Sequence, residues 1–230
     1  MVQLRVLSGS RRCPGCPADR DHSFVTMIGE GKGECAFHGI TMEPRGALPE
    51  RWFVPGGAAI VRHGAVIRTR SDAHGRVHGV DLAGPGHLLP LEPGEGRDQP
   101  GGYAISAARL CLASDGAFER ALSSGGEHAD DVADLVRVQR DGMRRVERFS
   151  EARGRPGVES RVAAVIGVIL DELGLDLVLP EALQQRDLAI LAGVRHESVC
   201  RAIGTLEASG MVARTLEGLR ILDREALDGL

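Results

Sequence analysis

The sequence predicts an α+β chain with three parts in order: a β-roll, a long helix and a winged helix-turn-helix. From about residue 10 to residue 111, short apolar segments alternate with turns rich in Gly and Pro. Residues 129–149 contain no Pro and repeat apolar residues at helical spacing. Residues 180–230 follow the order helix, turn, helix and hairpin. These three observations define the fold class.

Composition limits the range of functions. The 230 residues carry a formal net charge of −4, which excludes binding of nucleic acid through overall basicity but permits a local basic face. Hydrophobic residues at 43% are ordinary for a folded domain, so disorder is not the main state. No apolar run approaches the roughly 18 residues that cross a bilayer, and residues 1–10 carry no export signal. We therefore expect a cytoplasmic protein with no membrane partner.

The first part of the chain has the turn chemistry of an all-β unit. Glycine, at 31 residues, has about twice its usual share. Short strands at regular spacing with Gly and Pro breaks are typical of a β-roll, here a cupin-like jelly roll. The apolar segments that predict these strands are 58–61, 65–67, 77–82 and 103–112.

The second part predicts two helices. Along 129–149, apolar and polar positions three and four apart resemble the seam between two paired helices: Val132, Val136, Gln139, Met143 and Val146. A helix that packs only on its own domain gives a similar pattern, so spacing alone leaves both interpretations open. Residues 159–173 predict a second, more apolar helix that ends at Gly174.

The third part predicts a winged helix. Residues 184–191 and 196–209 are expected helices joined by a tight turn at 192–194. Residues 211–214 and 219–222 form the expected hairpin, with its turn at 217–218. Apolar residues fall where two crossing helices share a core: Leu188, Leu191, Val194, Val199, Ile203 and Leu206.

The stretch from Arg186-Asp187-Leu188-Ala189 through Gly193-Val194-Arg195-His196-Glu197-Ser198-Val199-Cys200-Arg201 to Gly210-Met211-Val212 resembles the DNA-binding end of the CRP/FNR regulators. The resemblance implies a transcription regulator that is not an enzyme. It implies a β-roll sensor domain with a Cys-rich N-terminal segment at 1–127, a dimerisation helix and hinge at 128–157, and a winged-helix DNA-binding domain at 158–230. The implied partners are a second copy through helix 129–149, double-stranded DNA with a two-fold operator, and RNA polymerase.

The start of a recognition helix faces base edges in the major groove. Arg can bond guanine O6 and N7, and Glu can accept from cytosine N4. Glu197 and Arg201, four residues apart, project from one helix face, although elsewhere such a pair would be a surface salt bridge. FNR-type members carry a small hydroxyl residue at the position of Cys200. The residues expected to contact DNA are Arg186, Arg195, His196, Glu197, Ser198, Cys200 and Arg201.

The charge of this domain opposes DNA binding. Residues 151–230 contain 9 arginines and 13 acidic residues, whereas DNA affinity depends on neutralising phosphates. We expect a local basic face around the reading helix and wing, and binding that is sensitive to salt and aided by dimerisation. Its members are Arg186, Arg195, Arg201, Arg214 and Arg220.

The sensor part lacks the cyclic-nucleotide signature of CRP-like members, a Gly-Glu turn and a later phosphate-binding Arg. The corresponding stretches here are 86–89 and 99–103, and neither carries the required side chain unless Glu92 and Arg97 substitute for them. Without a cation facing the phosphate, little would hold the anion. We therefore expect no cyclic nucleotide as the effector.

The cysteines suggest a different effector. Five cysteines in a chain without an export signal indicate reduced thiols or metal ligands. FNR-like members hold an iron–sulfur cluster with three N-terminal cysteines and a fourth before the dimer helix. The resemblance thus implies a [4Fe–4S] cluster on Cys13, Cys16, Cys35 and Cys111. The spacing departs from the family, because Cys35 follows Cys16 by 19 positions instead of a few.

Other interpretations of these residues remain open. The four thiolates could hold structural zinc, or Cys111 could be an ordinary buried thiol. Haem or another small ligand is an alternative, although the histidines show no characteristic spacing. A cupin-like metal enzyme with an appended helical domain is a remote alternative, since no His-x-His pair is present.

Overall fold

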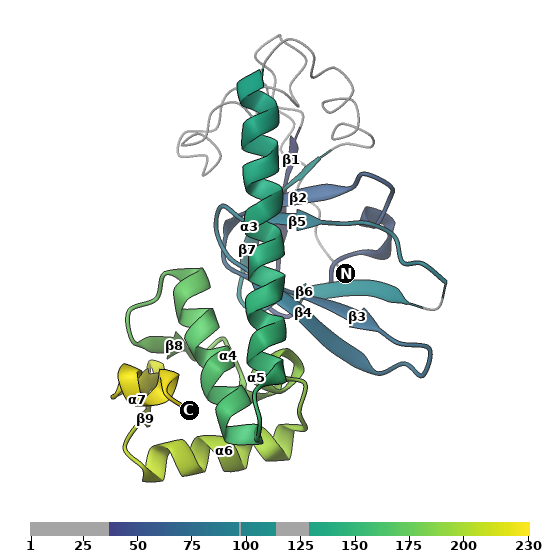
Figure 1. Cartoon of the computed structure of the whole chain (residues 1–230). Helices are drawn as coiled ribbons and strands as arrows, with labels where there is room; N and C mark the ends of the chain where they lie inside the picture. The colour runs from purple at the N-terminus through teal and green to yellow at the C-terminus, as the bar shows by residue number, and fades with distance from the viewer. Residues whose placement is uncertain (1–36, 97, 114–128) are drawn as a thin grey trace. The chain divides into compact units, whose positions relative to one another are not determined.

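The computed structural model describes residues 37–96, 98–113 and 129–230 (Figure 1). The predicted α+β class is confirmed: strands dominate the first half, and helices with a small sheet make up the second. The described residues divide into two compact units, one within residues 37–66 and 83–143 and the other of residues 67–82 and 144–230. Each unit has a core of its own.

The first unit is built on a four-stranded antiparallel sheet of strand order β1-β7-β2-β5. Its strands are β1 (Phe37–Met42), β2 (Ala58–His63), β5 (Leu88–Pro90) and β7 (Ala108–Ala113). The unit also contains the 3-10 helix η2 (Glu50–Trp52) and strand β6 (Gln99–Ala104). The apolar segment 103–112, predicted as one strand, is divided between β6 and β7, because the chain bends where the N–H of Ile105 donates to the carbonyl of Ala65.

Side chains on one face of this sheet form the core of the first unit. Alternation along β7 directs Ala108 and Leu110 into the core and places Arg109 and Cys111 on the other face. The single tryptophan of the chain, Trp52, is buried in the same cluster. The larger core residues are Ile40, Met42, Leu48, Trp52, Val61, Val66, Leu89, Leu91 and Leu110.

The second unit includes a hairpin of strands β3 (Val66–Ser71) and β4 (Val77–Ala83). Asp72 shapes its turn by accepting hydrogen bonds from the backbone N–H groups of His74 and Arg76. These bonds, foremost that from Arg76, lower the pKa of Asp72 to about 2. The hairpin turn is therefore held by a carboxylate that stays ionised into the acidic range.

The same hairpin is fastened to helix α3 (Ala129–Gly154) by a buried carboxylate. Asp81, with no exposed surface, accepts from Arg68 Nε at 2.6 Å and from Arg145 Nε at 2.8 Å. Burial by itself raises the pKa of Asp81, but the bonds and charges of the two guanidinium groups outweigh burial and lower it. Arg145 is only 2% exposed, so this ion pair lies inside the unit.

A second arginine of α3 joins the hairpin to the helical part of the unit. Arg153 Nη1 donates to the carbonyl oxygen of Gly79 at 2.9 Å and lies within 3.5 Å of that of Leu191. At Gly79 the backbones approach so closely that a Cβ would lie 2.8 Å from the carbonyl oxygen of Ile190. Only glycine allows this approach without a shift of the backbone.

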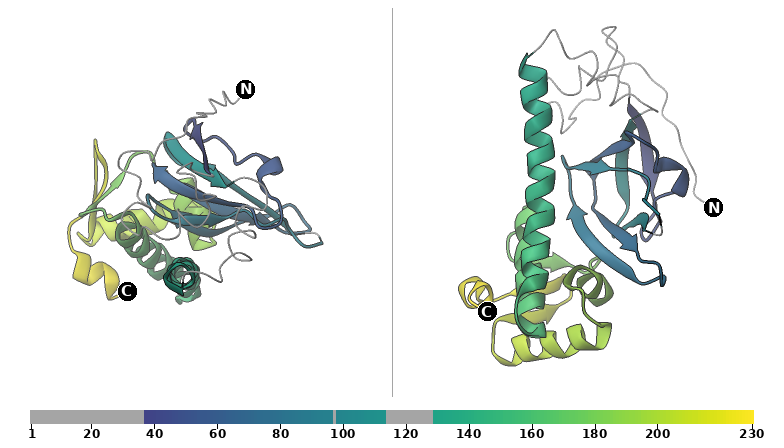
Figure 2. Two further views of the ribbon diagram at one scale, coloured as in Figure 1. Left: turned by 90° about the horizontal axis from the view of Figure 1, so that it is seen from above. Right: turned by 45° about the vertical axis from the view of Figure 1, so that its right-hand side comes forward.

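The helical part has the predicted order. Helix α4 (Val158–Leu173) ends at Gly174, whose φ of 58° is left-handed, and α5 (Gln185–Ala192) ends similarly at Gly193. Helix α6 (His196–Ala208) precedes the strands β9 (Val212–Thr215) and β10 (Gly218–Ile221). Helix α3 extends five residues beyond its predicted end at 149. Strand β8 (Val178–Pro180) pairs with β10, which gives a three-stranded sheet of order β8-β10-β9. Helix α7 (Arg224–Asp228) packs on α4 (Figure 2).

We predict that Asp81→Asn destabilises the protein by about 3 to 5 kcal/mol, because it leaves the buried guanidinium of Arg145 and the half-buried one of Arg68 without their carboxylate. Since folding lowers the pKa of Asp81, its stabilisation is complete above the ordinary aspartate pKa of 3.8 and is lost as the pH falls through the folded value. Urea unfolding at neutral and at acidic pH measures both effects. The exposed Asp176→Asn is the matched control. Equal stability of the two variants would contradict the prediction.

Candidate nucleic-acid interface

Helices α5 and α6 are held in a fixed crossing by their shared turn and by a capping carboxylate. Gly193 adopts a φ of 64°, and the N–H of Val194 donates to the carbonyl of Ala189 at 3.0 Å. Asp187 is fully buried and accepts from the N–H of Gln184 at 2.7 Å, which fixes the start of α5. Helix α6 packs on α4 and α5 (Figure 1) through its apolar face: Val199, Ala202, Ile203 and Leu206.

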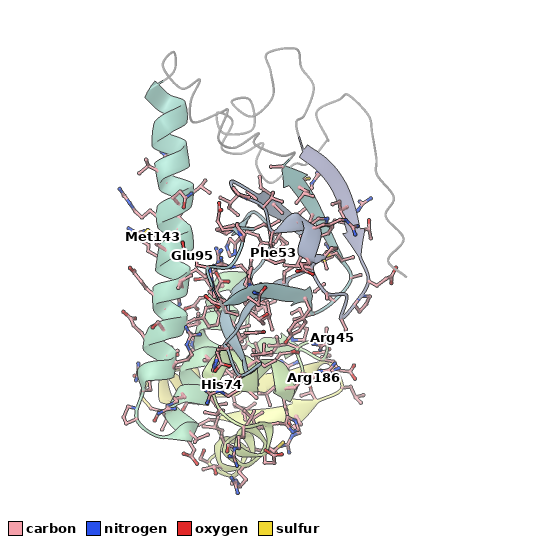
Figure 3. All side chains as sticks on the ribbon, turned by 90° about the vertical axis from the view of Figure 1, so that its right-hand side faces the viewer. Arg45, Phe53, His74, Glu95, Met143 and Arg186 are labelled. Carbon is pink, nitrogen blue, oxygen red and sulfur yellow. The ribbon has the colours of Figure 1, made fainter. Side chains whose placement is uncertain are left out.

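The opposite face of α6 is exposed and polar. Arg195, His196, Glu197 and Arg201 are exposed, whereas Ser198 and Cys200 are half-buried. The seventh predicted residue, Arg186, is exposed at the start of α5 (Figure 3). The structure thus brings the predicted set onto one helix-turn-helix, and contact with DNA stays a prediction.

The arginines around this face differ in their partners. Among the residues that the structure describes, no ion pair involves Arg186, Arg195 or Arg201, and none joins Glu197 to Arg201. The two wing arginines are paired: Arg214 Nη1 lies 2.6 Å from Glu207 Oε2, and Arg220 Nη2 lies 2.9 Å from Glu217 Oε2. Surface ion pairs are weak, so these two remain able to exchange partners with a phosphate. The Glu207–Arg214 pair also fastens the wing to α6.

One contact of this surface was not predicted. Cys200 Sγ lies 2.8 Å from Oε1 of Gln185, the first residue of α5, and donates a hydrogen bond to it. The two residues are 15 positions apart and belong to different helices. Because the contact depends on how α5 crosses α6, no local sequence pattern signals it.

The predicted cluster ligands are described only in part. Cys13, Cys16 and Cys35 lie outside the described residues. Cys111 is 9% exposed on the face of β7 opposite to the core cluster, and it pairs in register with Gly39 and Ile60. A Cβ built on Gly39 would meet no described atom within 4 Å. Cys111 is thus a buried thiol, and its role as a metal ligand stays a prediction.

Other polar groups of the first unit have structural roles. Both carboxylate oxygens of Glu92 accept from the N–H of Gly56, at 3.1 and 3.3 Å. The side chain of Glu92 therefore already binds the backbone of the turn at Gly56. His87 Nδ1 accepts from the N–H of Gly84 at 3.1 Å. The second suggested substitute, Arg97, lies outside the described residues. Within the described ranges, no three His, Cys, Asp or Glu side chains gather as a metal site, and no helix is long and apolar enough to cross a membrane.

Comparison with solved structures assigns the architecture. FixK2 from Bradyrhizobium japonicum superposes with a TM-score of 0.69 at 19% identity, over 84% of this chain and 96% of that protein. TTHB099, a CRP-family transcriptional regulator from Thermus thermophilus, gives 0.63 at 16% identity, over 83% and 96%. The c-di-GMP responsive global regulator CLP from Xanthomonas campestris gives 0.60 at 16% identity, over 81% and 94%. These similarities show the fold, a β-roll followed by a long helix and a winged helix.

A family model matches the helix-turn-helix part of the chain. Residues 160–230 match the model of the Crp-like helix-turn-helix domain, which covers α4 to α7. The match assigns a Crp-like helix-turn-helix domain to this part of the chain, and the fold of the preceding residues is similar to that of solved regulators such as FixK2 and TTHB099. No curated protein matches the chain in sequence.

We predict that Arg201→Ala loses sequence-specific DNA binding while the fold is kept. Loss of a paired contact to a guanine costs about 1 to 3 kcal/mol, or roughly five- to 150-fold in affinity. Gel retardation on a duplex selected by the wild-type protein from a random library measures the loss. Arg155→Ala, an exposed arginine outside α5 and α6, is the matched control. Binding by Arg201→Ala equal to that of wild type would show that the recognition helix is misplaced.

Proposed function

We propose that this chain is a homodimeric, sequence-specific transcription regulator whose DNA binding responds to a redox- or gas-sensitive [4Fe–4S] cluster. The observation that carries the proposal is the exposed polar face of α6 within a Crp-like helix-turn-helix domain. The proposed role is regulatory and not enzymatic. RNA polymerase is the expected protein partner at the promoter.

In the proposed complex, α6 enters the major groove and its first turns face the bases. Glu197 and Arg201 read base edges, and because they do not pair with one another, both side chains remain available to DNA. Arg186 and Arg195 neutralise phosphates on either side of the groove. The paired wing arginine Arg214 keeps the hairpin in position beside the groove.

Homodimerisation is proposed through α3. Two residues of the predicted seam of this helix are exposed: Val136 at 49% and Met143, labelled in Figure 3, at 63%. Gln139 between them is exposed and Val146 is half-buried. A second copy would cover these apolar side chains, and its two-fold axis would match a two-fold operator.

The cluster is proposed on Cys13, Cys16, Cys35 and Cys111. The support is the position of Cys111 on the face of β7 opposite to the core cluster, in register with Gly39, which has no side chain. When bound, an iron–sulfur cluster supplies a centre that oxygen or nitric oxide can attack. Structural zinc on the same thiols is the second candidate, because four thiolates also suit tetrahedral zinc. Haem or another small-molecule effector is the third.

We expect the full chain, purified without oxygen, to be coloured and to contain iron and acid-labile sulfide. Visible absorption and metal analysis measure this. Cys111→Ser should lose the colour and the iron, whereas Cys200→Ser, which lies outside the proposed set, should keep both. A colourless protein with stoichiometric zinc would overturn the cluster and leave the DNA-binding role intact.

We predict that Met143→Glu converts the dimer to a monomer, because two copies would bring carboxylates together in an apolar seam. Light scattering coupled to size exclusion measures the mass. Leu177→Glu is the matched control, since Leu177 is also an exposed apolar residue, at 42%, but lies outside α3. A variant that remains dimeric would exclude this seam as the interface.

A further inference from the structure

Cys200 connects the two helices of the recognition motif through one hydrogen bond. Its Sγ lies 2.8 Å from Gln185 Oε1, and the imidazole of His196, one turn earlier on α6, lies 3.8 Å from the same sulfur through Nε2. Both Cys200 and Gln185 are half-buried, whereas His196 is exposed. The thiol therefore sits at the inner edge of the polar face of α6.

The chemistry of the two groups determines what each can still offer. A thiol has one S–H, and here the S–H is donated to Gln185, so it is not available to a base or a phosphate. Gln185 uses its carbonyl oxygen as the acceptor, which leaves the two N–H donors of its amide on the other branch of the planar group. The bond thereby selects which end of the amide is available to a ligand.

The position of Gln185 indicates what that ligand is. Gln185 is the first residue of α5, between the exposed side chains of Gln184 and Arg186. In a helix-turn-helix the first helix crosses the phosphate backbone while the second lies in the groove. Neutral amide donors are ordinary phosphate ligands, and the N-terminus of a helix favours an anion in the same place.

We propose that Cys200 is a positioning residue for DNA recognition: its thiol holds the Gln185 amide so that the N–H donors face a backbone phosphate. The inference rests on the proposed function of α5 and α6 as the DNA-binding element. It reassigns Cys200 from a direct DNA contact to a residue that acts through Gln185.

The first test is a double-mutant cycle on the full-length protein. The probe is the duplex that wild type selects from a library of double-stranded DNA with a randomised core. Gln185→Ala and Cys200→Ala should each weaken binding about two- to tenfold, the usual range for one hydrogen bond. The double variant should bind no more weakly than Gln185→Ala alone, because the thiol acts only through the amide. Cys200→Ser, which keeps a donor on the same Cβ, should restore most of the affinity.

The salt dependence separates an amide contact from a charged one. A neutral amide releases no counterion, so Gln185→Ala should leave the slope of log affinity against log salt unchanged. Arg186→Gln, one residue along α5, should reduce that slope by about one. A loss of slope in Gln185→Ala would contradict the proposed contact.

Two further outcomes would overturn the inference. Independent, additive losses in the cycle would mean that Cys200 does not act through Gln185, and a lower melting temperature of Cys200→Ala that accounts for its weaker binding would assign the thiol to stability. The proposed function fails in a different way, because then wild type would enrich no sequence and Arg201→Ala would bind the library as wild type does.

Discussion

A single buried carboxylate holds the second unit together. Asp81 has no exposed surface, so its charge is tolerable only because Arg68 and Arg145 both bond to it. A buried ion pair of this kind adds little net stability compared with a well-packed apolar cluster, since desolvation offsets its attraction. With Asp81 on β4 and Arg145 on α3, the pair links the position of the hairpin to that of the helix.

That placement extends to the recognition helix through backbone contacts. Arg153, two turns beyond Arg145 on α3, donates to the carbonyls of Gly79 and Val80, and its Nη1 lies 3.5 Å from the carbonyl of Leu191. The absence of a side chain at Gly79 lets β4 approach the end of α5. Because α5 and α6 share a tight turn, the β3–β4 hairpin, the end of α3 and the recognition helix are one packed structure. The hairpin thus belongs with the DNA-binding helices, although it lies far from them in sequence.

The sequence predicts those elements whose residue pattern continues over many positions. The helices of the second half have sustained periodicity and glycine stops at Gly174 and Gly193, and their bounds differ from the predicted ones by one or two residues, except at the end of α3. Strand β8 and helix α7 were not predicted, because three and five residues are too few to show a period. The contacts of Asp81 with Arg145 and of Cys200 with Gln185 join residues 64 and 15 positions apart, and only the packed structure brings them together.

The acidic composition of residues 151–230 does not give the local charge around α6. Several of the acidic side chains have structural partners: Asp187 caps α5, Glu207 pairs with Arg214, and Asp171 and Glu172 both bond to Arg148. In the described part of the chain, by contrast, the three arginines nearest the reading face, Arg186, Arg195 and Arg201, form no ion pair. The charge at the exposed face of α6 therefore comes from these three guanidinium groups and the carboxylate of Glu197, and not from the net charge of the domain.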